Sequence, residues 1–82
     1  MSAILVSALM IVSFYFLSYL AAAHRANPGA EVSGQELQHA FGLDAATVRA
    51  QGAELARQGL VEWDPLLTNI WIRITDRGLE GF

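Results

Sequence analysis

Residues 33–59 read SGQELQHAFGLDAATVRAQGAELARQG and predict two helices joined by a tight turn. Ser33 and Glu36 fit a capping box, in which the serine hydroxyl and the glutamate carboxylate satisfy free N–H groups at a helix start. Gly42 fits the position just past a helix end, where a left-handed residue is common. Asp44 can then cap a second helix. The stretch therefore predicts a helix-turn-helix.

After residue 59 the apolar pattern changes to a period of two, which is typical of strands. Residues 60–64 and 69–75 are the strand candidates, and residues 65–68 form the hairpin tip between them. In the second candidate strand, isoleucines alternate with Trp71 and its neighbours, so the isoleucines and the tryptophan should face opposite sides of the sheet.

Several short motifs of this region recur in one known superfamily: Gln35-Glu36-Leu37, Phe41-Gly42-Leu43, Thr47-Val48-Arg49, LARQGLVE at 55–62, and Ile74-Thr75-Asp76-Arg77-Gly78. With these motifs, residues 31–80 resemble the winged helix-turn-helix superfamily. The resemblance implies a winged-helix fold and either DNA binding or protein interaction. Gly52 departs from the pattern, because a large aliphatic residue usually stands there; either a bulky neighbour such as Trp63 or an approaching helix would fill the space.

Ahead of this region lies an apolar run, from Ala3 to Ala23, without a charged residue. As a helix it would be about 31 Å long, close to the thickness of the bilayer hydrocarbon. The sequence therefore predicts a transmembrane helix, with span residues that include Ala3, Ile11, Phe14, Phe16, Leu20 and Ala23. Arg25 follows directly, so the positive-inside rule places the C-terminal domain in the cytoplasm, or on the interior side of a virion.

Two other interpretations of the apolar run stay open. A cleaved signal peptide is one, because residues 21–23 are alanines that resemble a cleavage site, although no basic residue precedes the run. A buried helix of a soluble fold is the other, although the small remainder of the chain can cover only part of an all-round apolar helix.

These patterns predict a mainly α fold with a small β-hairpin, built from one transmembrane helix and a winged helix-turn-helix domain. The expected organisation is a transmembrane helix at residues 1–25, a turn or linker at 26–30, and the winged-helix domain at 31–82. The domain lacks the helix that normally precedes its first strand. The end of the apolar helix before Arg25 is the candidate to supply it.

Charge disfavours nucleic acid as a partner. Residues 31–82 carry eight acidic residues against four arginines, and hence a net charge of −4. Neutralisation of phosphates supplies most non-specific DNA affinity, so a DNA-binding face normally shows a basic patch. If the domain binds DNA, the candidate contacts are Thr47, Arg49 and Arg57.

The hairpin tip offers an apolar surface instead. Leu66 and Leu67 lie at the predicted tip, near the outward-facing Trp71. Exposed apolar groups that cluster in this way mark contact surfaces. These three residues are the candidate partner contacts, unless the two leucines fold back onto the core.

The chain shows no catalytic constellation and no phosphate-binding loop, so we do not expect an enzyme or a cofactor. The chain has no cysteine, and its two histidines, His24 and His39, stand far apart, so we expect no metal site.

The favoured function is an accessory or structural subunit of a larger membrane assembly (respiratory, photosynthetic, secretory or a lipid-containing virion). Its partners would be the lipid bilayer and other proteins. The alternative is a membrane-anchored transcription regulator.

Overall fold

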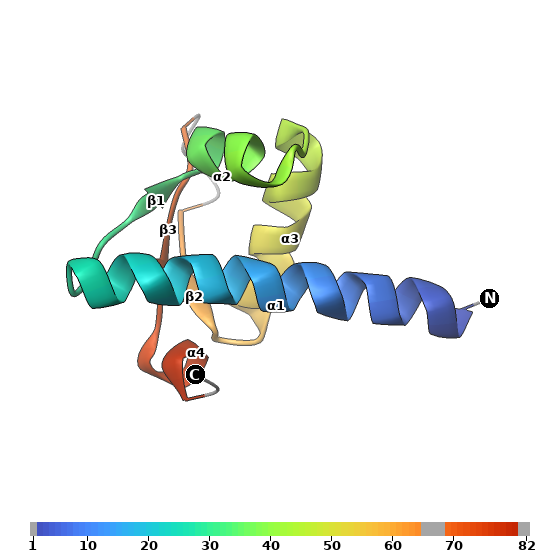
Figure 1. Ribbon diagram of the computed structural model, residues 1–82, viewed down its shortest axis with the longest axis horizontal. Helices are drawn as coiled ribbons and strands as arrows, with labels where there is room; N and C mark the ends of the chain where they lie inside the picture. Colours follow the sequence, from blue (N-terminus) through green and yellow to red (C-terminus); the bar gives the residue numbers. More distant parts are fainter. Residues whose placement is uncertain (1, 65–68, 81–82) are drawn as a thin grey trace.

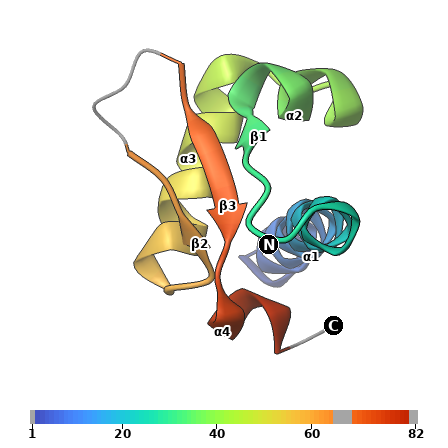
Figure 2. The same ribbon diagram turned by 90° about the vertical axis from the view of Figure 1, so that its left-hand side faces the viewer.

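The computed structural model describes the backbone of residues 2–64 and 69–80 and the side chains of residues 12–64 and 69–80 (Figure 1). The elements of this part of the chain are α1 (Ser2–Ala26), β1 (Val32–Ser33), α2 (Gly34–Phe41), α3 (Ala45–Arg57), β2 (Val61–Glu62), β3 (Trp71–Ile74) and α4 (Asp76–Leu79). The strands form an antiparallel sheet in the order β1-β3-β2, with α3 behind the sheet in Figure 2.

The two helices predicted over residues 33–59 are confirmed as α2 and α3. The hydroxyl of Ser33 accepts a hydrogen bond from the backbone N–H of Glu36 at 3.0 Å, and the carboxylate of Asp44 caps α3 in the same manner. Gly42 ends α2 with a φ of 63°, the left-handed conformation that glycine adopts without a steric penalty. Local capping chemistry therefore sets the start of both helices and the end of α2.

The predicted two-stranded hairpin is wrong as a description of the sheet. β1 adds a third strand, because Val32 pairs with Ile72 and Ser33 pairs with Trp71. On the other edge of β3, Val61 of β2 pairs with Ile74. β3 is therefore the central strand, and its register decides which side chains face the helices.

α1 supplies part of the hydrophobic core. Phe16, Leu20 and Ala21 are each at most 1% exposed and belong to the same buried cluster as the sheet and the other helices. The ring of Phe16 stacks on that of Phe41 in α2, with 5.0 Å between the ring centroids. The helix before Arg25 is therefore part of the hydrophobic core of this small domain.

The prediction of a transmembrane helix is wrong, because no helix within the described residues is both long enough and apolar enough to cross a membrane. In the second half of α1, Phe16, Leu20 and Ala21 are buried in the same core as the sheet of their own chain. Its polar groups also have partners there: Tyr19 donates a hydrogen bond to the Glu36 carboxylate at 2.5 Å, and Ser13 accepts one from Gln51. The fold is therefore a small, mostly helical domain with a three-stranded antiparallel sheet.

Gly52 lies where α3 packs against the sheet and Trp63. A Cβ at this position would lie 3.2 Å from Cδ1 of Ile72 and 3.7 Å from Cζ3 of Trp63. The space that a larger side chain would occupy is therefore filled by Trp63 and the central strand. Of the two explanations offered for this glycine, the bulky neighbour is the correct one.

Candidate functional site

Trp71 is an exposed large hydrophobic side chain of the sheet. Along β3, Ile72 and Ile74 are buried, whereas Trp71 and Arg73 are exposed, so the alternation predicted for this strand is confirmed. Trp71 is 47% exposed. We call the side of the sheet that carries Trp71 and Arg73 the outer sheet face. In Figure 2 no helix or strand of the described chain lies in front of β3 on this side.

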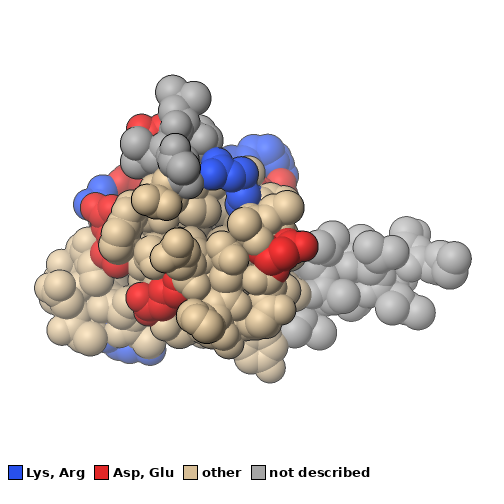
Figure 3. All heavy atoms as spheres, turned by 90° about the horizontal axis from the view of Figure 1, so that it is seen from above, with Lys and Arg blue, Asp and Glu red and all other residues tan. Residues whose placement is uncertain are grey.

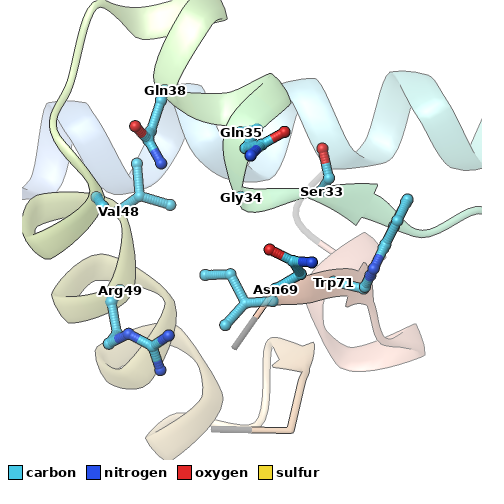
Figure 4. A pocket seen from close by; sticks show the side chains of 10 residues that line it. Ser33, Gly34, Gln35, Gln38, Val48, Arg49, Asn69 and Trp71 are labelled. Carbon is cyan, nitrogen blue, oxygen red and sulfur yellow. The ribbon is translucent and has the colours of Figure 1, made fainter. Parts of the chain in front are cut away.

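A groove of about 390 Å³ runs between α2, α3 and the start of β3, and we call it the α2–α3 groove. It is lined by Ser33, Gly34, Gln35, Gln38, Ala45, Val48, Arg49, Asn69, Ile70 and Trp71. In Figure 4, Gln35 and Gln38 extend from α2, Arg49 from α3, and Asn69 and Trp71 from the strand side. Amide groups dominate its polar lining, so the groove can both donate and accept hydrogen bonds.

The floor of the groove depends on a close contact at Gly34. A Cβ there would lie 2.6 Å from Cγ1 of Ile70, a distance that requires the isoleucine to move. The Gly34 N–H donates a hydrogen bond to the Ile70 carbonyl at 2.9 Å. This glycine therefore lets the start of α2 lie directly against the chain entering β3.

A second hollow, of about 280 Å³, lies on the outer sheet face, and we call it the acidic hollow. Its lining residues are Glu31, Glu62, Trp63, Asp64, Trp71 and Arg73. Trp71 lines both this hollow and the α2–α3 groove. The tryptophan is therefore the shared wall of two adjoining depressions.

Ion pairing organises the charges of the acidic hollow. Arg73 donates a hydrogen bond to the carboxylate of Glu62, its partner in the β2–β3 register. This hydrogen bond, followed by the charges of Glu62 and Glu31, raises the pKa of the Arg73 guanidinium. Viewed from above, acidic and basic side chains are scattered over a mainly uncharged face, and some of opposite sign lie next to each other (Figure 3).

The structure does not gather the candidate DNA contacts on one surface. Thr47 and Arg49 are two positions apart on α3, a rotation of about 200°, so they lie on opposite sides of the helix. The Arg49 guanidinium lies 5.8 Å from the ring centroid of Trp63. Arg57 forms an ion pair with Glu54 at 2.6 Å. Only Arg49 of the three lines the α2–α3 groove.

The structure describes one of the three candidate partner contacts. Trp71 is exposed beside two depressions, whereas Leu66 and Leu67 lie outside the described residues. The sequence analysis missed Gln35, Gln38 and Asn69 as groove residues. Spaced glutamines on a helix are a weak signal by themselves, because most solvated helices carry them.

The residues assigned to the membrane span have different roles. Phe16 and Leu20 are core residues and Ala23 packs against the core, whereas Phe14 is 57% exposed. Figure 1 shows the N-terminal part of α1, which includes Ala3 and Ile11, extending past the other elements. The neighbouring Tyr15 is 55% exposed, and its ring meets that of Phe14 edge to face.

Among the described residues, no three of the histidine and acidic side chains come together as a possible metal site.

The comparisons with known proteins found no matching family model, no matching curated protein and no matching solved structure. The resemblance to a winged helix-turn-helix behind a transmembrane helix is therefore not supported. The motifs behind it are caps, turn glycines and strand alternation, which many unrelated domains share.

Proposed function

We propose that this protein is a non-enzymatic accessory or structural subunit that binds another protein through the surface around Trp71. The observation that carries the proposal is the 47% exposure of Trp71 between the α2–α3 groove and the acidic hollow. Tryptophan is enriched at interface positions that dominate binding energy, where it fills or flanks a depression.

The N-terminal part of α1 offers a second contact surface. Phe14 and Tyr15 are both more than half exposed, and the helix continues past the other elements toward the N-terminus (Figure 1). Residues 2–11 contain no charged side chain. An apolar helix that extends beyond its own core can pack against a helix of another subunit, as in the helix-in-groove mode of recognition.

Site-specific photo-crosslinking in the native cell tests the proposal. A benzophenone amino acid at position 71 of the full-length chain should form one dominant crosslink to a partner protein. The same amino acid at Ala53, which is exposed on α3, is the matched control and should give little product. Equal, diffuse crosslinking from both positions, or none from position 71, would refute the proposal.

A further inference from the structure

The two parts of α1 have different surroundings. In the second part, the helix packs on its own domain with one side: Phe16 and Leu20, one turn apart, are buried, whereas Phe14 and Tyr15 are more than half exposed. Over residues 2–11 the helix continues past the other elements of the described chain (Figure 1). We call this stretch the α1 extension, and it lies beyond the elements that cover the rest of the helix.

The sequence of the α1 extension is apolar all round the helix. It reads SAILVSALMI, with two serines and no charged residue. Consecutive helical positions are about 100° apart, so the apolar runs at residues 3–6 and 8–11 leave no polar side. Serine hydroxyls can bond back to the helix backbone and are therefore compatible with an apolar medium. A groove on a protein covers one side of a helix, whereas lipid acyl chains surround it, so this pattern favours lipid.

The length of the α1 extension matches one leaflet of a bilayer. A helix rises about 1.5 Å per residue, so residues 2–11 extend over about 15 Å, half of the roughly 30 Å of bilayer hydrocarbon. Phe14 and Tyr15 follow the extension within one turn and are 57% and 55% exposed. Tyrosine is enriched at the boundary between membrane and water, where its ring is in apolar surroundings and its hydroxyl reaches water. The exposed rings therefore stand where the helix would leave the lipid.

Charge indicates which headgroups the chain tolerates. The whole chain has a net charge of −3, so anionic headgroups repel it. The driving force for lipid binding would then be the burial of apolar side chains, which does not depend on headgroup charge. Zwitterionic lipid is therefore sufficient.

We infer that the α1 extension inserts into one leaflet of a lipid bilayer, with Phe14 and Tyr15 at the headgroup boundary and the folded domain at the membrane surface. Insertion to this depth attaches the chain to the membrane surface without crossing the hydrocarbon. The inference goes beyond the proposed function, because it involves neither Trp71 nor the depressions beside it.

A fluorophore placed at single positions of the full-length chain tests the inference. The chain has no cysteine, so Ala8→Cys offers one thiol for a nitrobenzoxadiazole label. With phosphatidylcholine vesicles, this label should shift to the blue and be quenched by lipids that carry a spin label on the acyl chain. The matched control is Ala22→Cys, an exposed position in the second part of the same helix, where the label should show neither effect.

Two charge-matched variants locate the inserted segment. Leu5→Arg places a charge in the α1 extension and should weaken partitioning into the vesicles by about tenfold or more, because a buried arginine is costly in hydrocarbon. Ala22→Arg adds the same charge to the second part of α1 and should change partitioning little. Circular dichroism without lipid reports whether each variant has folded. Adding phosphatidylserine to the vesicles should not strengthen binding.

Three outcomes would overturn the inference. The first is an unshifted label at position 8 in the presence of vesicles, which needs no charged variant to fold. The second is a blue shift that appears without lipid and grows with protein concentration, since a second copy of the chain would then cover the extension. The third is binding that requires phosphatidylserine and is equal for Leu5→Arg and Ala22→Arg. Crosslinking from position 71 is measured separately, so the proposed function can stand when this inference fails, and the reverse.

Discussion

The side-chain amide of Gln51 in α3 donates a hydrogen bond to the hydroxyl of Ser13 in α1, which lies 38 positions earlier in the chain. Among the side chains that the structure describes, Gln51 is the buried polar one, with 7% of its surface exposed. A buried amide without a partner costs its full desolvation free energy, so α1 satisfies a polar group of α3 as well as covering apolar ones.

Replacing Ser13 with alanine should therefore lower the free energy of unfolding by about 1–3 kcal/mol, because the Gln51 amide loses its partner. Chemical denaturation followed by circular dichroism measures the loss. Ser18→Ala removes the same atoms from the same helix and is the matched control. In a double-mutant cycle, Gln51→Leu should recover part of the stability of Ser13→Ala; strictly additive effects would contradict the direct contact.

Phe14 and Phe16 form a matched pair that tests the role of α1. Phe16 is fully buried against Phe41, whereas Phe14 is 57% exposed. Phe16→Ala should cost about 3–5 kcal/mol of unfolding free energy, the usual range for a buried phenylalanine. Phe14→Ala should cost far less. Similar losses for the two variants would contradict the placement of α1 in the core.

The local signals of the sequence predict the helices well. The cap residues Ser33 and Asp44 and the left-handed Gly42 act through their own neighbours, so their effect is visible without knowledge of the fold. The role of α1 was not visible in this way. An apolar run has the same composition whether it faces lipid or a protein core. Whether α1 packs into the core depends on partners that are distant in the sequence, such as Phe41 and Gln51.

Only the part of the candidate site that lies on a single strand could be predicted from the sequence. Alternation within residues 69–75 correctly predicts that Trp71 faces outward. The acidic hollow also needs Glu31 and Asp64, which reach it only through the pairing of β1 and β2 with β3. Strand pairing of this kind depends on contacts that are distant in the sequence, so a period-two pattern cannot reveal it.

Gly78 and Gly52 should respond differently to alanine. A Cβ at Gly78 would lie 2.3 Å from the backbone carbonyl oxygen of Leu60, which cannot move without shifting the chain. Gly78→Ala should therefore destabilise the protein by about 1–3 kcal/mol or more. At Gly52 the nearest atom is the flexible end of Ile72, at 3.2 Å, and alanine gains about 1 kcal/mol of helix propensity.

Thermal unfolding of both glycine variants measures this difference. Gly52→Ala should change the Tm little, because the helix propensity gained offsets the crowding of Ile72. Gly78→Ala should lower the Tm by several degrees, since about 1 kcal/mol corresponds to roughly 4–8 °C in a domain of this size. An unchanged Tm for Gly78→Ala would show that α4 does not pack against Leu60 as described.

Glu54 should titrate at an unusually low pH. Hydrogen bonds from Arg57, and then from Gln58, lower the pKa of this carboxyl from 4.5 to about 2. A lowered carboxyl pKa stabilises the folded state above the unfolded-state pKa. That contribution is lost as the pH falls from about 4.5 through about 2. Carboxyl-carbon NMR measures the titration directly, and Arg57→Gln should return the pKa toward its ordinary value.

The chain should bind duplex DNA weakly if at all. Arg57 is paired with Glu54, Arg49 lies over Trp63, and the region from residue 31 to the C-terminus has a net charge of −4. Few phosphates can then be neutralised, so any binding should appear only at low salt and disappear near about 0.15 M. Fluorescence anisotropy with a labelled duplex measures it. Binding that persists at that salt concentration and is lost in Arg49→Ala, but not in the control variant Arg77→Ala, would favour a DNA-binding regulator over a protein-binding subunit.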